Sequence, residues 1–311
     1  MGEGGLVHWD DVEPQRDDEG HFGFAVRRLG RAAGCVAVTV NRAEISPGRW
    51  STPAHVEDEE IFYVLGGSGL SWQDGTVYEV REGDCVVHRA RAEAHTLRGG
   101  DEGLDVLAFG RAGGDGHATL PRAGVTWLGS SWVASGLGDH PWDQEAAVGE
   151  PEVGEPEERP KNIVNVGDLE QERWIDLADA AGSAKSGLNV VTVAPGKLPA
   201  PAHCHSAEEE IFVILEGDGT LELWPSPLAA ERGAEREDIS LRPGHVIARP
   251  PGGRVGHAFQ AGPSGLTMLI YGTRRPNDMA WFPRSNKIFW RGLGVIGRIE
   301  TLEYDDGEPD D

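Results

Sequence analysis

The sequence predicts an all-β protein built from two similar barrels in tandem. A motif-bearing stretch recurs after roughly 150 residues, and the apolar segments are short, rich in Val, Ile, Phe and Leu, and bounded by Gly or Pro. No long amphipathic helical pattern interrupts them. The chain has 311 residues, which is about twice the size of a usual domain. Each half therefore has room for a core of its own.

The internal repeat is the strongest of these observations. The first copy is SPGRWSTPAHVEDEEIFYVLGGSG from Ser46, and the second is APGKLPAPAHCHSAEEEIFVILEGDG from Ala194. Both contain a PG turn, a PAH triplet, an EEIF run that enters an apolar strand, and a glycine-rich turn. Further on, REGDCVVHRARAEAHTL (81–97) matches RPGHVIARPPGGRVGHAF (242–259). A period of this length predicts a duplicated domain and not a solenoid.

The stretch between the copies is acidic, contains Pro and Gly, and lacks apolar periodicity, which is typical of an exposed connection. We therefore expect an N-terminal domain over 1–137, an acidic linker over 138–160, a C-terminal domain over 161–292, and an extension with an acidic tail over 293–311. The best candidate for a short helix is DLEQERWIDLADAAG (168–182).

Charge and composition exclude several functions. The formal net charge is -24, from 52 acidic and 28 basic residues, so the surface would repel phosphate backbones and anionic lipids. We expect no nucleic acid or membrane partner. The sequence starts without a signal-peptide pattern and has no apolar stretch that could span a membrane, which favours a cytoplasmic protein. Three cysteines without a CxxC pair argue against a disulfide framework or a zinc ribbon.

The second copy carries residues that predict a metal site. His203 and His205 are two positions apart, so on a strand they face the same side. Glu210 begins the next strand, and His257 arrives from a later one. Three imidazoles and one carboxylate suit Fe, Mn, Ni, Cu or Zn better than Ca or Mg. Four such ligands leave two positions open on an octahedral ion, and Glu210 is also available as a catalytic base.

These residues resemble the two motifs of the cupin superfamily, G-x5-H-x-H-x3,4-E-x6-G and G-x5-P-x-G-x2-H-x3-N. The first motif is matched by the HxH pair, four spacers, Glu210, six spacers and Gly217. The second is matched loosely by Gly244, Pro250, Gly253 and His257, because three residues precede this histidine and Ala261 replaces the Asn. The resemblance runs from about 34 to 292 and implies a bicupin: two tandem cupin barrels of the double-stranded β-helix or jelly-roll type.

The first copy has a degenerate version of the motif. His55, Glu60 and His95 take the places of the first histidine, the glutamate and the distal histidine, while Glu57 stands where the second histidine of HxH would be. These four residues predict a second metal site, although a metal-free pocket or a structural domain is the alternative. His88 occupies the place of the motif proline and is interpreted as lining a pocket or packing in the core.

The resemblance leaves the function open, since cupins include dioxygenases, decarboxylases, sugar isomerases and ligand-binding proteins. We rank first a metal-dependent oxygenase that acts on a small aromatic, keto-acid or hydroxy-acid substrate, with Fe(II) favoured and Mn, Ni, Zn or Cu as alternatives. A manganese-dependent decarboxylase or a sugar isomerase-type cupin is the second hypothesis, and a non-catalytic binding module is the third. An open sheet edge is compatible with a homodimer.

Overall fold

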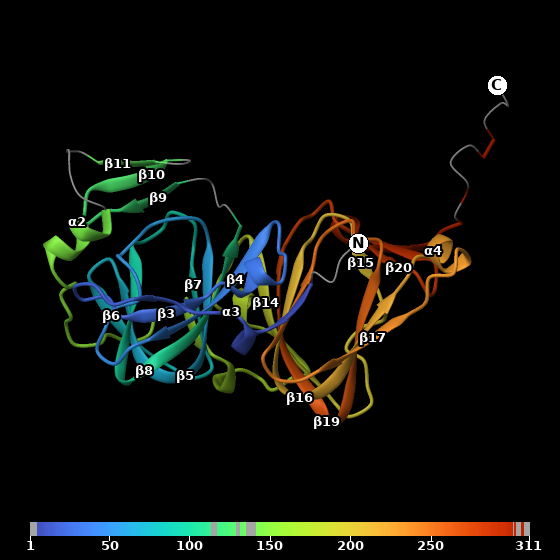
Figure 1. Ribbon diagram of the computed structural model, residues 1–311, viewed down its shortest axis with the longest axis horizontal. Coiled ribbons are helices and arrows are strands. Elements are labelled where there is room, and N and C mark those ends of the chain that lie inside the picture. Colours follow the sequence, from blue (N-terminus) through green and yellow to red (C-terminus); the bar gives the residue numbers. More distant parts are fainter. Residues whose placement is uncertain are drawn as a thin grey trace.

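The computed structural model describes residues 5–112, 117–128, 131–134, 141–300, 302 and 306–307. Two strand-rich units lie side by side along the longest axis of the molecule (Figure 1). Strands dominate both units, and the α-helices in the described part of the chain are short. None of these helices has the length and apolar character needed to cross a membrane. The prediction of an all-β, duplicated jelly-roll fold is confirmed.

The N-terminal unit consists of an eight-stranded sheet and a separate three-stranded sheet. Its elements are β2 (Gln15–Asp17), β3 (Phe24–Arg27), α1 (Leu29–Ala32), β4 (Val38–Ile45), β5 (Glu60–Gln73), β6 (Thr76–Arg81), β7 (Asp84–His88), β8 (His95–Arg111), β9 (His117–Leu120), β10 (Val125–Leu128), β11 (Ser131–Ala134), α2 (Pro141–Val148) and β12 (Ile163–Asn165). The order of the larger sheet is β12-β7-β5-β8-β4-β3-β2, with β6 on β5. The sheet β11-β10-β9 lies at one end of the unit (Figure 1).

The C-terminal unit repeats this plan with a seven-stranded and a four-stranded sheet. Its elements are β1 (Leu6–His8), β13 (Trp174–Asp176), α3 (Leu177–Ala180), β14 (Ser186–Val193), β15 (Cys204–His205), β16 (Glu210–Trp224), α4 (Pro227–Glu231), β17 (Glu237–Leu241), β18 (His245–Arg249), β19 (Gly256–Thr273), β20 (Met279–Phe282), β21 (Lys287–Trp290) and β22 (Val295–Arg298). The larger sheet has the order β1-β18-β16-β19-β14-β13, with β17 on β16, and the smaller one is β15-β20-β21-β22.

Neither large sheet closes into a continuous hydrogen-bonded barrel, since each pairing path has two free ends. Each sheet instead bends within its two longest strands. The register between β5 and β8 shifts at Gly67, and that between β16 and β19 shifts at Gly217. Both glycines have a φ of 79°, and a side chain at either position would meet a backbone oxygen of the neighbouring strand. The motif glycine therefore marks the bend.

The first strand of each unit is exchanged with the other unit. β1 pairs with β18, and β12 pairs with β7. Each exchanged strand runs into a 3-10 helix, Trp9–Asp11 or Val166–Asp168, whose first N–H donates to the carbonyl of Gly244 or Gly83 at 3.0 and 2.9 Å. The domain limits predicted from the sequence assign residues 6–8 to the N-terminal domain and residues 163–165 to the C-terminal domain. In the structure each of these strands pairs with the sheet of the other unit.

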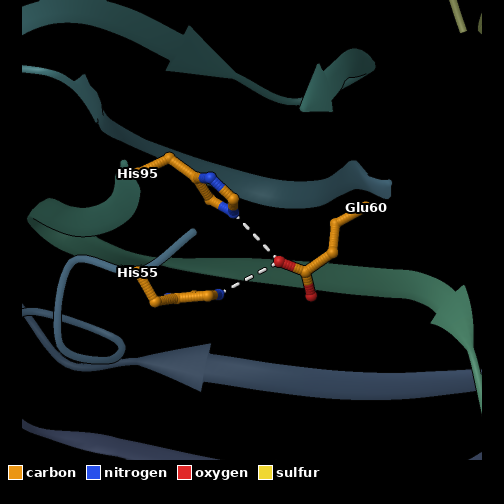
Figure 2. Close-up of side chains that lie close together, drawn as sticks. All are labelled: His55, Glu60 and His95. Atoms are coloured by element: carbon orange, nitrogen blue, oxygen red, sulfur yellow. Dashed lines mark hydrogen bonds and ion pairs between the residues drawn. The ribbon is translucent and has the colours of Figure 1, made fainter. Parts of the chain in front are cut away.

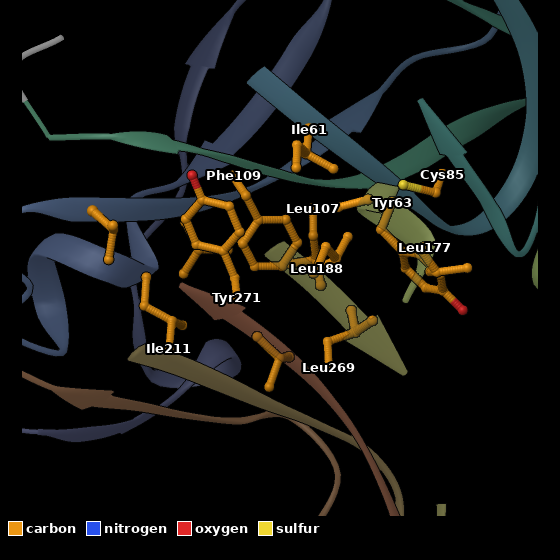
Figure 3. Close-up of a cluster of buried hydrophobic side chains, with 14 of the residues drawn as sticks. Ile61, Tyr63, Cys85, Leu107, Phe109, Leu177, Leu188, Ile211, Leu269 and Tyr271 are labelled. Carbon is orange, nitrogen blue, oxygen red and sulfur yellow. The ribbon is translucent and has the colours of Figure 1, made fainter. Parts of the chain in front are cut away.

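Strand alternation gives the central strands two buried faces. Phe62 in β5 and Phe212 in β16 point into the interior of their own unit. The alternate residues, such as Ile61 and Ile211, join a core shared by both units, where the rings of Phe109 and Tyr271 lie 5.1 Å apart (Figure 3). The same alternation separates the consecutive glutamates of each EEIF run. Glu60 and Glu210 lie on the inner face of their own unit, and the glutamate before each of them faces the other unit.

Those preceding glutamates, Glu59 and Glu209, cross the interface. The carboxylate of Glu209 accepts N–H bonds from Val36, Ala37 and Val38 at 2.9, 2.5 and 2.9 Å. That of Glu59 accepts from the N–H groups of Ala184 and Ser186 at 2.8 and 3.0 Å. Each carboxylate is buried and satisfies backbone donors at the start of the other unit's sheet. The two contacts are equivalent under the internal duplication.

Two expectations about the connecting segments are met only in part. The segment 168–182 contains a short helix, Leu177–Ala180, which is capped by the Asp176 carboxylate, but β13 in the same segment pairs with β14. The acidic stretch is not wholly exposed either, since α2 buries Glu145 against Arg122. The predicted domain boundary at 137 and most of the acidic tail, 303–305 and 308–311, lie outside the described residues.

Candidate metal centre

The C-terminal unit brings all four predicted ligands together. Nε2 of His205 and of His257 lie 3.3 and 3.2 Å from the same Glu210 oxygen, Oε2. His203 completes the group, with its ring centroid 5.1 Å from His205 and 4.8 Å from His257. His203, Glu210 and His257 present ligand atoms within 4.8 Å of one another.

Several of these atoms are buried without a hydrogen-bond partner, which is the observation that tests the fit of a metal. Nε2 of His205, Nε2 of His257 and Oε2 of Glu210 are orphaned in this way. Buried polar atoms are normally satisfied, and converging orphans of this chemistry are what a divalent cation would complete. The residues therefore fit a metal ion. Their assignment as its ligands stays a proposal.

Neighbouring groups fix the orientation of two of the imidazoles. Nδ1 of His203 donates to the carbonyl of Pro201 at 2.8 Å, and Nδ1 of His205 donates to Asp278 at 2.6 Å. Asp278 is fully buried and also accepts the N–H bonds of Ala207 and Glu208. Each contact leaves Nε2 free to face the cluster, as a metal-binding histidine requires.

The electrostatics of this cluster also suit a cation. Burial lowers the pKa of His257 to about 4, so this imidazole is neutral and carries a free lone pair. Burial also opposes a charged His205, but Asp278 and Glu210 outweigh it and raise the pKa of His205 to about 10. Burial raises the pKa of Glu210, yet the two adjacent imidazoles hold it well below its ordinary value. A bound metal would displace the proton on His205.

The N-terminal unit brings three of its four predicted ligands to one point. Nε2 of His55 and Nε2 of His95 donate to the same oxygen of Glu60 at 3.1 and 2.9 Å (Figure 2). Glu57 lies beside them: burial and the neighbouring Glu60 raise the pKa of Glu57 to about 8. Two carboxyl groups with two imidazoles can hold a cation, and this second site also stays a proposal.

His88 is fully buried in this unit, as expected of a pocket or core residue. Its ring stacks on His95 with centroids 3.7 Å apart and planes 1° from parallel. Nδ1 of His88 lies 2.7 Å from Glu93, and Nε2 is buried without a partner. Because an imidazole coordinates a metal in its ring plane, two parallel stacked rings cannot share one ion in this arrangement.

Sequence reasoning missed three polar neighbours of the two clusters. Asp278 lies 73 residues after His205 and outside both motifs, and nothing in its local sequence predicts the contact. Glu93 contacts His88 in the loop before β8. Arg249 stands opposite Glu210 on the neighbouring strand. The position of Arg249 opposite Glu210 could have been inferred from the EIF and VIAR segments, but only if the pairing of these two strands had been known.

The fold and the two clusters define a class: a duplicated jelly-roll protein with an imidazole–carboxylate cluster in each unit. Residues 41–109 match the family model of a cupin domain, and no curated protein matches the sequence.

Solved structures of oxalate decarboxylase from Bacillus subtilis share the whole architecture. The structure at pH 4.6 is 16% identical, covers 87% of this chain and 76% of its own, and has a TM-score of 0.59. A second structure, from a study of that enzyme's Mn(II) centres, is 16% identical, covers 89% of this chain and 79% of its own, and has a TM-score of 0.60. A third structure, from a study of that enzyme's substrate binding mode and reaction specificity, is 15% identical, covers 89% of this chain and 79% of its own, and has a TM-score of 0.59.

The chain therefore contains a cupin domain over residues 41–109, and its two-domain fold is like that of these structures. The predicted resemblance to the cupins is thereby confirmed. At 15 to 16% identity the likeness to oxalate decarboxylase shows the fold. The chemistry of the two clusters fits a divalent metal. Cytoplasmic location and a homodimer stay predictions.

Proposed function

We propose that this bicupin is a manganese-dependent enzyme that removes a carboxyl group from a small carboxylic acid. The observation that carries the proposal is the convergence of His203, His205, Glu210 and His257 on orphaned buried atoms, in a fold shared with enzymes named as decarboxylases. The decarboxylase hypothesis, ranked second on the sequence, therefore takes precedence over the oxygenase. No observation on the described residues favours the oxygenase or Fe(II).

In the proposed reaction the bond between the carboxyl carbon and its neighbour breaks and CO2 leaves. The electron pair stays on the neighbouring carbon, which then takes a proton. A divalent cation in this site supplies Lewis-acid polarisation of a carboxylate oxygen. The role of the protein is to hold the cation with the three histidines and Glu210, to keep His205 aligned through Asp278, and to restrict water. Glu210 as a base stays a prediction, since its contacts favour a ligand role.

The activity is tested on metal-stripped protein reloaded with Mn(II) or Fe(II), with oxalate, malonate and a panel of keto acids as substrates. We expect the manganese form to release one CO2 for each substrate molecule without stoichiometric oxygen consumption. Stoichiometric oxygen uptake by the iron form would return the assignment to an oxygenase. If the protein turns over none of these substrates with either metal, it is a binding module and the proposal is overturned.

The metal site itself is tested by His203→Ala and His257→Ala. Each variant should lose most of the manganese that is bound in the C-terminal unit, because removing one ligand leaves an incomplete shell. Metal content is measured by elemental analysis and by the Mn(II) EPR signal. His55→Ala serves as the matched variant in the other unit, and it should lower the metal-to-protein ratio only if that unit binds metal. Wild-type metal content in both C-terminal variants would refute the proposed ligand set.

A further inference from the structure

In each unit one side chain stands opposite the proposed metal-ligand glutamate on a neighbouring strand. In the C-terminal unit Glu210 pairs with Arg249 of β18 and with Gly272 of β19, which has no side chain, and in the N-terminal unit His88 of β7 pairs with Glu60. Directly paired residues on antiparallel strands project from the same face. Since Glu60 and Glu210 lie on the inner faces, both opposing side chains lie on those inner faces too.

Arg249 is a partly buried cation that forms no ion pair with the described residues. Its Nε is buried and unpaired, and its one hydrogen bond runs from Nη2 to the carbonyl of Val255 at 3.1 Å. A guanidinium stays charged at physiological pH. A partly buried charge that forms no ion pair gains from an anion placed beside it.

In the N-terminal unit the matching position is occupied by the imidazole of His88 and not by a guanidinium. The ring of His88 is fully buried and stacks on His95 with centroids 3.7 Å apart. Its Nδ1 contacts Glu93, and the cluster beside it already contains the carboxyl groups of Glu57 and Glu60. The N-terminal unit therefore has no guanidinium at this position to meet a second anion.

We propose that Arg249 binds a carboxylate of the substrate at the C-terminal centre, and that the N-terminal unit, with His88 in its place, does not bind this anion. A guanidinium suits this task because its planar N–H donors match the two oxygens of a carboxylate. The inference deepens the proposed function, on whose metal centre it rests. It assigns the substrate class as a small carboxylate with a second oxygen group available for the metal.

The test uses the manganese-loaded full chain and oxalate as the probe, with binding followed by calorimetry and by the Mn(II) EPR signal. Arg249→Gln should keep the wild-type manganese content and bind oxalate at least about tenfold more weakly, because a buried charge partner is lost. Arg249→Lys should retain part of the affinity. His88→Gln is the matched control and should leave oxalate binding unchanged.

A second measurement does not depend on any variant folding correctly. Metal-stripped wild-type protein, which lacks the cation's own preference for an anion, should still bind oxalate more tightly than oxamide, its uncharged analogue of the same size. Equal affinity for the two, or equal weakening by Arg249→Gln and His88→Gln, would overturn the inference. The binding readout needs no turnover, so protein that binds oxalate through Arg249 without releasing CO2 would refute the proposed decarboxylation and leave this inference standing.

Discussion

At the scale of single residues, the C-terminal centre depends on contacts beyond its four candidate ligands. His205 faces Glu210 on one side and donates on the other to Asp278, whose carboxylate also accepts two backbone N–H bonds. A buried carboxylate behind a histidine fixes the tautomer and turns Nε2 toward the ion. Asp278 is therefore a positioning residue for the proposed metal.

Asp278→Asn tests this role. Manganese affinity should fall by about 10- to 100-fold, which is the usual effect of losing such a partner of a ligand histidine. The measurement is a competition titration with a chelator that reports bound Mn(II). Asp238→Asn, which changes an exposed carboxylate on β17, should leave the affinity unchanged. Unchanged affinity in Asp278→Asn would mean that packing alone orients His205.

Sequence reasoning found most ligand candidates at this scale because HxH, the glutamate and the distal histidine stand at motif spacing. It also identified His55, Glu60 and His95 in the copy where the motif is broken, and these three side chains do meet. The sequence could not predict the contacts of Asp278 and Arg249 or the stacking of His88 on His95, because these depend on which strands become neighbours. Local sequence carries no record of that pairing.

At the scale of elements, a glycine allows the long central strand to bend. Gly217 has a φ of 79°, and a Cβ there would lie 2.2 Å from the carbonyl oxygen of Gly265. The bend lets one continuous strand contribute Glu210 to the metal cluster and Leu221 to the interior core. Gly67 performs the same task in the first unit, where Gly103 is the close neighbour.

Gly217→Ala should destabilise the protein by roughly 3 kcal/mol, from backbone strain together with the clash against the adjacent strand. Thermal unfolding followed by circular dichroism measures the change. Gly233→Ala is the control, because this glycine has a φ of 91° but no heavy atom within 4 Å of the added Cβ. If both variants melt at the same temperature, strain alone explains the cost and the close approach contributes nothing.

At the scale of the whole molecule, the two units are interlocked. Each receives one strand from the other, they share a core, and Glu59 and Glu209 reach across to cap the backbone of the opposite unit. A buried carboxylate that satisfies several N–H donors is expensive to alter, because the donors lose a charged acceptor. The fold therefore ties the position of each candidate metal site to the interface.

Glu209→Gln should lower the stability of the whole chain by about 2 to 4 kcal/mol, because its amide NH2 opposes the N–H groups of residues 36–38. Calorimetry should show one unfolding transition that moves to lower temperature as a unit. Glu216→Gln, an exposed position on the same strand, should have little effect. A second, separate transition that appears while the first stays in place would contradict the coupling of the two units.

The sequence alone determined the duplicated all-β fold, the candidate ligands of both units and their order along the chain. These depend on local patterns: short apolar strands, turn glycines and motif spacing. Only the tertiary structure decided which residues stand behind and opposite the ligands, and that LVH at residues 6–8 belongs with the second half of the chain. The physical reason is that such pairings are set by burial and by backbone hydrogen bonds between segments far apart in sequence.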